Sequence, residues 1–151
     1  MENDIVDGEG VCVSFWTQGC PHRCKGCHNP ETWSFEDGIE ENDFDLLLKI
    51  INLINKNNVN RNLSILGGEP LCSQNKDFVL RLAKTAKAHF PNIKIFLWTG
   101  YLIEELQEKN SEILEYVDVL IDGPFILEKR DLSLYLRGSS NQRVLYKNKD
   151  Y

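Results

Sequence analysis

No stretch of the sequence resembles a membrane span or a secretion signal. The apolar runs are far shorter than the ~20 residues that cross a bilayer. The N-terminus, Met1-Glu2-Asn3-Asp4, is acidic and lacks the apolar core of a signal peptide. We therefore expect a cytoplasmic protein without a membrane partner. In a reducing compartment, its five cysteines are expected to bind metal or perform chemistry rather than form disulfides.

The sequence also lacks an excess of positive charge. It contains 17 Lys and Arg residues against 23 Asp and Glu residues, a net charge of −6. This balance argues against nucleic acid as the main partner. No repeat, low-complexity tract or linker interrupts the 151 residues, so residues 1–151 are expected to form a single domain.

Strand and helix patterns alternate along the chain, which predicts an α/β fold. Asn42 or Asp43 is expected to cap a first helix, and Ser73 a second one that stops before Pro91. A third helix is expected from Leu102. Short apolar runs predict strands at residues 11–16, 63–66, 93–98, 117–121 and 143–146.

Polar or glycine-rich segments follow four of these strands. They are a cysteine-rich loop, Gly67-Gly68-Glu69, Thr99-Gly100 and Asp122. Because the carboxyl ends of parallel strands share one edge of a sheet, we expect these segments to surround one pocket. Eight βα units need roughly 250 residues. The shorter chain therefore predicts an open partial barrel or a curved sheet with mainly parallel strands.

Three cysteines lie close together in the loop Cys20-Pro21-His22-Arg23-Cys24-Lys25-Gly26-Cys27. Thiolates at this spacing can converge on one metal centre. Zinc would need a fourth ligand, His22 or His28, but no second Cys or His pair follows at the usual distance. The loop therefore favours a four-iron, four-sulfur cluster held by three cysteines, with zinc as the alternative. Cys12 and Cys72 lack this spacing and are expected to be buried.

The spacing C-x3-C-x2-C resembles the signature of the radical S-adenosylmethionine (SAM) superfamily. The resemblance implies a radical SAM core in which Cys20, Cys24 and Cys27 bind one 4Fe-4S cluster. It also implies that the free iron binds SAM, and that an electron from the cluster cleaves SAM to a 5′-deoxyadenosyl radical. Gly67-Gly68-Glu69-Pro70 is similar to the superfamily segment that holds the SAM amino group.

Over nearly its full length the chain resembles one family, the activating enzymes of anaerobic (class III) ribonucleotide reductase. The resemblance implies that a reduced flavodoxin or ferredoxin-like donor supplies the electron. It further implies that the enzyme generates a glycyl radical on the reductase, its protein substrate. The stretches that carry it are Asp4-Ile5-Val6-Asp7-Gly8, Cys27-His28-Asn29, Thr32-Trp33, Gly67-Gly68-Glu69-Pro70, Trp98-Thr99-Gly100-Tyr101, Val119-Leu120-Ile121-Asp122-Gly123 and Arg137-Gly138-Ser139-Ser140-Asn141-Gln142.

The resemblance places Gly26, Cys27, His28 and residues 67–69 along the SAM site. From their positions after strands, Thr99 is expected near a ribose and Asp122 near a polar ligand group or cation. For residues 137–142 the sequence leaves two roles open, contact with a partner and closure of the pocket. Two other functions also stay open: activation of another glycyl-radical enzyme, and a zinc-binding interaction module without catalysis.

Overall fold

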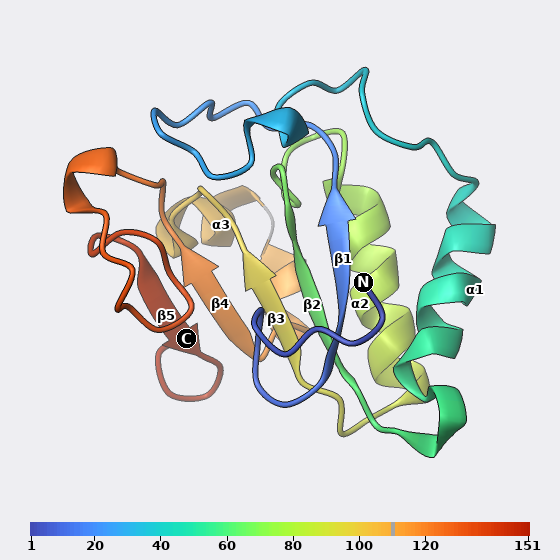
Figure 1. Ribbon diagram of the computed structural model, residues 1–151. Helices are drawn as coiled ribbons and strands as arrows, with labels where there is room; N and C mark the ends of the chain where they lie inside the picture. Colours follow the sequence, from blue (N-terminus) through green and yellow to red (C-terminus); the bar gives the residue numbers. More distant parts are fainter. Residues whose placement is uncertain (110) are drawn as a thin grey trace.

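A computed structural model describes residues 1–109 and 111–151. Five strands form one sheet in the order β1-β2-β3-β4-β5, so β1 and β5 are its two edges and the sheet is not closed (Figure 1). Strands β1 to β4 run parallel, and β5 pairs antiparallel with β4. The predicted α/β fold with mainly parallel strands is confirmed. The strands are β1 Cys12–Thr17, β2 Asn62–Gly67, β3 Ile95–Trp98, β4 Val119–Asp122 and β5 Arg143–Tyr146.

Three α-helices connect the parallel strands: α1 Asp43–Ile54, α2 Lys76–His89 and α3 Ile103–Lys109. Asn42 caps α1, as expected, because its side chain accepts hydrogen bonds from the first-turn amides of Phe44 and Asp45. None of the helices in the described ranges has the length and hydrophobicity of a membrane span.

The prediction that Ser73 caps α2 is wrong. The helix begins after Asn75, and no side chain caps it. The Ser73 hydroxyl instead donates to the side chain of Gln74. The Asn75 amide is used elsewhere, since it donates to the carbonyls of Gln18 and Glu69 at 3.0 Å each. The start of α2 is thereby tied to the ends of β1 and β2.

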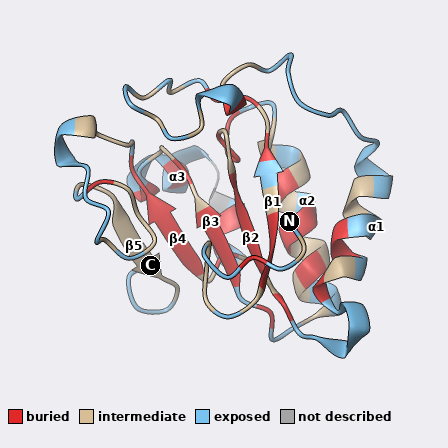
Figure 2. Ribbon diagram, in the orientation of Figure 1, coloured by how far each residue is buried: buried red, intermediate tan, exposed pale blue. Residues whose placement is uncertain are grey.

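The main core lies between the sheet and the helices, where β2, β3 and β4 are buried along their length (Figure 2). A smaller cluster around Phe96, Val119 and Ile121 covers the opposite face. Cys12 and Cys72 are both buried, as predicted. Burial raises the pKa of each thiol, which favours the protonated, unreactive form.

The N-terminal segment pairs with the outer edge of β1. Asp4 and Cys12 exchange backbone hydrogen bonds of 2.9 and 2.7 Å. The terminal amine and carbonyl of Met1 bond with the backbone of Ser14 at 2.7 and 2.9 Å. This segment therefore shields Cys12 and Ser14 on an otherwise open sheet edge.

Candidate functional site

The carboxyl ends of β1, β2 and β3 surround a pocket of about 190 Å³. The arrangement follows from the parallel sheet, which places these ends along one edge. The three clustered cysteines line it together with residues from the ends of the next two strands. Of the residues predicted for the site, the pocket wall contains Cys20, Cys24, Cys27, Gly67, Gly68, Glu69 and Thr99.

Backbone hydrogen bonds hold the cysteine loop above the sheet. Gly19 donates to Thr32 at 2.8 Å, and Cys20 donates to Trp33 at 3.1 Å. Within the loop, Cys27 N donates to Cys24 O at 3.1 Å. All three thiols are free. Because the backbone holds the loop without a disulfide, its sulfurs remain available as metal ligands.

Two of these cysteines have surroundings relevant to metal binding. The amide of Asn29 donates to the Cys27 sulfur at 3.4 Å, a contact of the kind that tunes iron–sulfur centres. Burial raises the pKa of the Cys20 thiol above its usual range. Metal binding must therefore displace a proton held more tightly than in a free cysteine.

Glu69 is the buried centre of the site. Its Oε1 accepts hydrogen bonds from Leu71 N at 2.9 Å and from the Thr99 hydroxyl at 2.7 Å. Its Oε2 lies 2.8 Å from Gly100 N, which donates to it, and 2.7 Å from His22 Nε2. A carboxylate removed from water needs such partners. Glu69 therefore joins the ends of β2 and β3 to the cysteine loop.

Gly67 and Gly68 let the cysteine loop lie directly on the end of β2. Gly67 has a φ of +109°, and a Cβ there would lie 2.5 Å from the backbone of Thr17. A Cβ on Gly68 would lie 2.3 Å from the carbonyl oxygen of Gly19. Both positions thus exclude a side chain. The sequence predicted that these glycines bring backbone close to a ligand. The structure shows Gly67 against Thr17, the last residue of β1, and Gly68 against Gly19, just before the cysteine loop.

Two comparisons with known proteins agree with this site. The family model for a 4Fe-4S single cluster domain matches residues 6–145. An anaerobic ribonucleoside-triphosphate reductase-activating protein from Haemophilus influenzae is 40% identical over 93% of this chain and 91% of its own length. Proteins of the same name from Escherichia coli K12 (38% identity, 93% and 92% coverage) and phage T4 (37%, 97% and 90%) are similar over almost the same span.

The chain belongs to the anaerobic reductase-activating protein family. For this family member, the residues present fit an iron–sulfur cluster: three free thiols line one pocket, and a backbone amide donates to one sulfur. Within the described residues, no group of three or more His, Cys, Asp or Glu side chains is arranged to hold a single metal ion. His22, considered from the sequence as a zinc ligand, lies against Glu69 and packs edge-on against Tyr101 at 4.6 Å between ring centroids.

Three residues predicted for the cofactor site of this activating protein, Gly26, His28 and Asp122, do not line the cysteine pocket. A Cβ on Gly26 would meet the side chain of Leu127 at 2.8 Å. His28 packs on Phe125, with ring centroids 5.5 Å apart, and lines a neighbouring groove. Asp122 is fully buried and accepts hydrogen bonds from Arg143 and from the amide of Ile103.

Asp122 is paired within the protein. It lies opposite Arg143 in the β4–β5 register, and the guanidinium donates to both carboxylate oxygens at 3.0 and 2.5 Å. The amide of Ile103 also donates to it at 2.8 Å, at the start of α3. Asp122 therefore holds β5 and α3 onto the end of β4. Its contact with a polar ligand group stays a prediction.

Replacing Arg143 with Ala is expected to lower the free energy of unfolding by about 2–3 kcal/mol, because it leaves the buried Asp122 carboxylate without its counter-charge. The estimate lies below the range for fully buried pairs, since the Arg143 side chain is 41% exposed. Thermal unfolding measures the effect. The matched control is Glu104→Gln. It removes only the exposed ion pair between Glu104 and the same arginine. Equal losses in the two variants would contradict the assignment.

Two further residues, Trp16 and Gln142, line the pocket. Sequence reasoning missed Trp16, and it named Gln142 only within residues 137–142, for which partner contact and pocket closure both stayed open. Trp16 is the fifth residue of β1, and strict alternation along the strand was the signal that places its side chain on the face away from the helices. Gln142 is positioned by its own loop: its side chain accepts from the amides of Gly138 and Ser139 and donates to Gly123 O. Of residues 137–142, Gln142 therefore lines the cysteine pocket, whereas Arg137 and Gly138 line the neighbouring groove.

A groove of about 770 Å³ adjoins the pocket and opens to the surface. Residues 5–8 and 133–138 line it, and Cys27, Trp98 and Gln142 belong to both hollows. The N-terminal segment and residues 133–138 therefore face each other across this groove, and the Tyr135 hydroxyl also donates to Glu9 at 3.0 Å.

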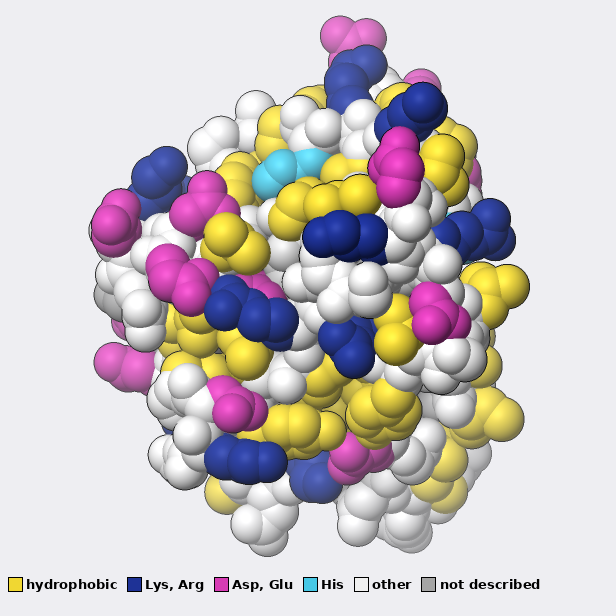
Figure 3. Space-filling model, turned by 90° about the vertical axis from the view of Figure 1, so that its left-hand side faces the viewer, with side chains coloured by type: hydrophobic (Ala, Val, Ile, Leu, Met, Phe, Trp, Pro, Cys, Tyr) yellow, Lys and Arg dark blue, Asp and Glu magenta, His cyan; other side chains and the backbone are white. Residues whose placement is uncertain are grey.

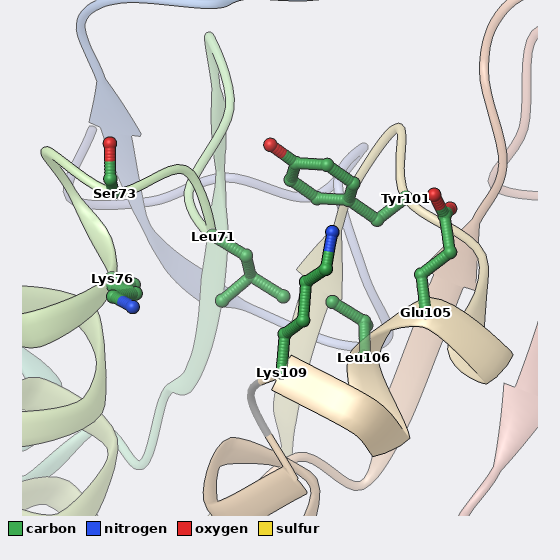
Figure 4. A pocket seen from close by; sticks show the side chains of 7 residues that line it. All are labelled: Leu71, Ser73, Lys76, Tyr101, Glu105, Leu106 and Lys109. Carbon is green, nitrogen blue, oxygen red and sulfur yellow. The ribbon is translucent and has the colours of Figure 1, made fainter.

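A separate hollow of about 210 Å³ lies between α2 and α3 (Figure 4). Lys109 extends into it beneath the Tyr101 ring, with Leu71 and Leu106 on its floor. Its wall contains no cysteine. Tyr101, on its wall, contacts His22 of the cysteine pocket.

Proposed function

We propose that this chain is a radical SAM enzyme that activates an anaerobic ribonucleoside-triphosphate reductase by generating a glycyl radical on it. One observation carries the proposal: Cys20, Cys24 and Cys27 line one pocket together with residues 67–69, at the carboxyl edge of a parallel sheet. The names of the relatives support the partner, and the family model supports the cluster.

The three cysteines would bind a 4Fe-4S cluster through three of its irons. With SAM bound, the cluster would supply the electron that cleaves SAM, and the carbon radical released from SAM would remove a hydrogen atom from glycine. The protein orients these groups and excludes water. Trp33 and Trp98 line the pocket beside the cysteines and provide apolar wall for that purpose.

Glu69 contributes a fixed negative charge on the pocket wall. This charge favours a ligand ammonium group, because opposite charges attract strongly where water is excluded. Since four donors already bind its oxygens, Glu69 keeps its position whether or not a ligand is present. We assign to Gly67, Gly68 and Thr99 the remaining contacts with SAM. Gly26, His28 and Asp122 would act from outside the pocket wall.

The adjoining groove supplies the access that a protein substrate needs. A backbone glycine of the reductase must reach the cysteine pocket, and the groove of residues 5–8 and 133–138 connects the pocket with the surface. No general base is required for hydrogen-atom abstraction. A reduced flavodoxin or ferredoxin-like protein would supply the electron at the cysteine loop.

Electron paramagnetic resonance tests the whole function. The anaerobically reconstituted chain, mixed with the reductase, SAM and a reductant, is expected to produce a glycyl radical signal that grows as SAM is cleaved. Mixtures without SAM are the control. Cleavage of SAM without a glycyl radical would show that the partner is wrong.

Two other functions predict different results. A zinc-binding interaction module would be colourless with one zinc per chain, whereas the cluster gives a brown protein with about four irons. An activase of another glycyl-radical enzyme often carries a ferredoxin-like insert with additional cysteines. The two remaining cysteines here, Cys12 and Cys72, are buried in the fold and do not belong to such an insert.

A further inference from the structure

The outer edge of β1 is covered at two of its three outward-facing residues. Cys12 and Ser14 direct their backbone groups outward, to Asp4 and Met1. By the alternation of a strand, Trp16 also directs its N–H and C=O outward. In the described part of the chain these two groups have no backbone partner. Figure 2 shows this end of β1 as exposed. A strand added at this edge could therefore pair with the N–H donor and the C=O acceptor of Trp16.

A groove of about 590 Å³ lies along this edge, between β1 and α1. Its floor is apolar and comes from both elements and from α2, with Phe15, Leu46, Leu53 and Phe78 among its lining residues. The coil that leads from the cysteine loop to α1 borders it (Figure 1). On this border Ile39 is 90% exposed. An exposed apolar groove beside an open strand edge is suited to an extended polypeptide.

The border of the groove is acidic. Residues 36–45 contain six carboxylates and no Lys or Arg. Glu41 pairs with Lys49 at 3.4 Å and Asp43 with Arg81 at 2.5 Å, but Glu40 forms no ion pair within the described ranges. On the opposite, β5 side of the molecule, charges of both signs are interspersed (Figure 3). Although Lys49 also lines the groove, Glu40, Glu41 and Asp43 outnumber it, so the β1 groove favours a partner segment that carries positive charge.

The groove adjoins the proposed active site through Trp16. This residue lines both the cysteine pocket and the β1 groove. A polypeptide held along β1 thus lies next to the cysteine loop without occupying the pocket itself.

We propose that the β1 groove binds an extended, basic segment of the reductase by strand addition. This inference rests on the proposed function for the identity of the partner. Along an extended segment, alternate side chains point to opposite sides. One set would cover Phe15 and Leu46, and the other would bring Lys or Arg to Glu40 and Glu41. A second copy of this chain is disfavoured as the occupant, because it would place the acidic residues 36–45 against each other.

Charge reversal tests the groove. The variant Glu40→Lys/Glu41→Lys is expected to weaken binding of the cluster-loaded chain to the purified anaerobic reductase by roughly tenfold or more. The loss should shrink at high salt, because exposed charges are screened. The control Glu108→Lys/Glu115→Lys makes the same change in net charge at exposed positions outside the groove. SAM cleavage with a chemical reductant, measured without the reductase, is expected to stay unchanged in both variants.

A photoreactive amino acid at Ile39 locates the occupant. We expect one crosslink, to a reductase segment that contains Lys or Arg, and none from the same group at Val59, which is exposed but lies outside the groove. Unchanged affinity of the groove variant, a wild type that does not bind, or a crosslink only to a second copy would each overturn the inference. A wild type that binds but forms no glycyl radical would instead overturn the proposed function and leave the groove assignment standing.

Discussion

Replacing Cys24 with Ala is expected to abolish iron binding and SAM cleavage while leaving the α/β fold in place. Only three cysteines line the pocket, so removing one leaves two thiols for a cluster that needs three protein ligands. Iron should fall from about four per chain to near zero, and cleavage to below about 1% of wild type, since the cofactor performs the chemistry.

The matched control is Cys72→Ala, which also removes one sulfur. Cys72 is buried near the start of α2 and does not line the pocket. This variant is expected to keep its iron and its activity, with a loss of stability of about 1 kcal/mol for the small cavity. Iron analysis, the visible spectrum and far-ultraviolet circular dichroism separate loss of cluster from loss of fold. Wild-type cleavage by Cys24→Ala would refute the ligand assignment.

Replacing Glu69 with Gln is expected to have the second largest effect, on both stability and activity. The four hydrogen-bond partners of Glu69 include the backbone amides of Leu71 and Gly100, and an amide side chain can accept with only one of its two terminal atoms. One buried donor is left unpaired, at a cost of about 1–3 kcal/mol. The cysteine loop also loses part of its anchor at His22.

For Glu69→Gln, SAM cleavage should fall about a hundredfold, because a shift of roughly 1 Å in a catalytic site has effects of this size. Glu31→Gln is the control, since Glu31 lies just after the cysteine loop with an exposed side chain. Thermal unfolding and cleavage assays on the cluster-loaded proteins measure both effects. Stability and cleavage equal to wild type would contradict the anchoring role of Glu69.

The strands were predictable because a buried parallel sheet demands short apolar runs. The residues at which the strands begin were harder to predict. The apolar runs predicted strands from residues 93 and 117, but β3 begins at Ile95 and β4 at Val119. The amides of Ile93 and Val117 instead bond back to Phe90 and Ile113 in the preceding turns. Hydrophobicity shows that a residue is buried but does not show whether its amide joins a turn or a strand.

The site was predicted in part. Cysteine spacing and the glycine-rich turn after β2 indicated which segments meet, and seven of the predicted residues line one pocket. Asp122 illustrates the limit. A carboxylate at the end of an apolar strand looks the same in sequence whether it faces a ligand or an arginine. Only the antiparallel pairing of β5 brought Arg143 opposite to it.

By itself, the sequence determined the α/β order and the group of three thiols at one strand end, because both depend on residues that are neighbours along the chain. The tertiary structure alone decided that Glu69 binds His22, 47 residues away, and that the outward backbone groups of Trp16 in β1 stay unpaired within the described residues. These features arise where distant segments fold together. Their energies depend on burial and on the geometry of partners, which local residue patterns do not encode.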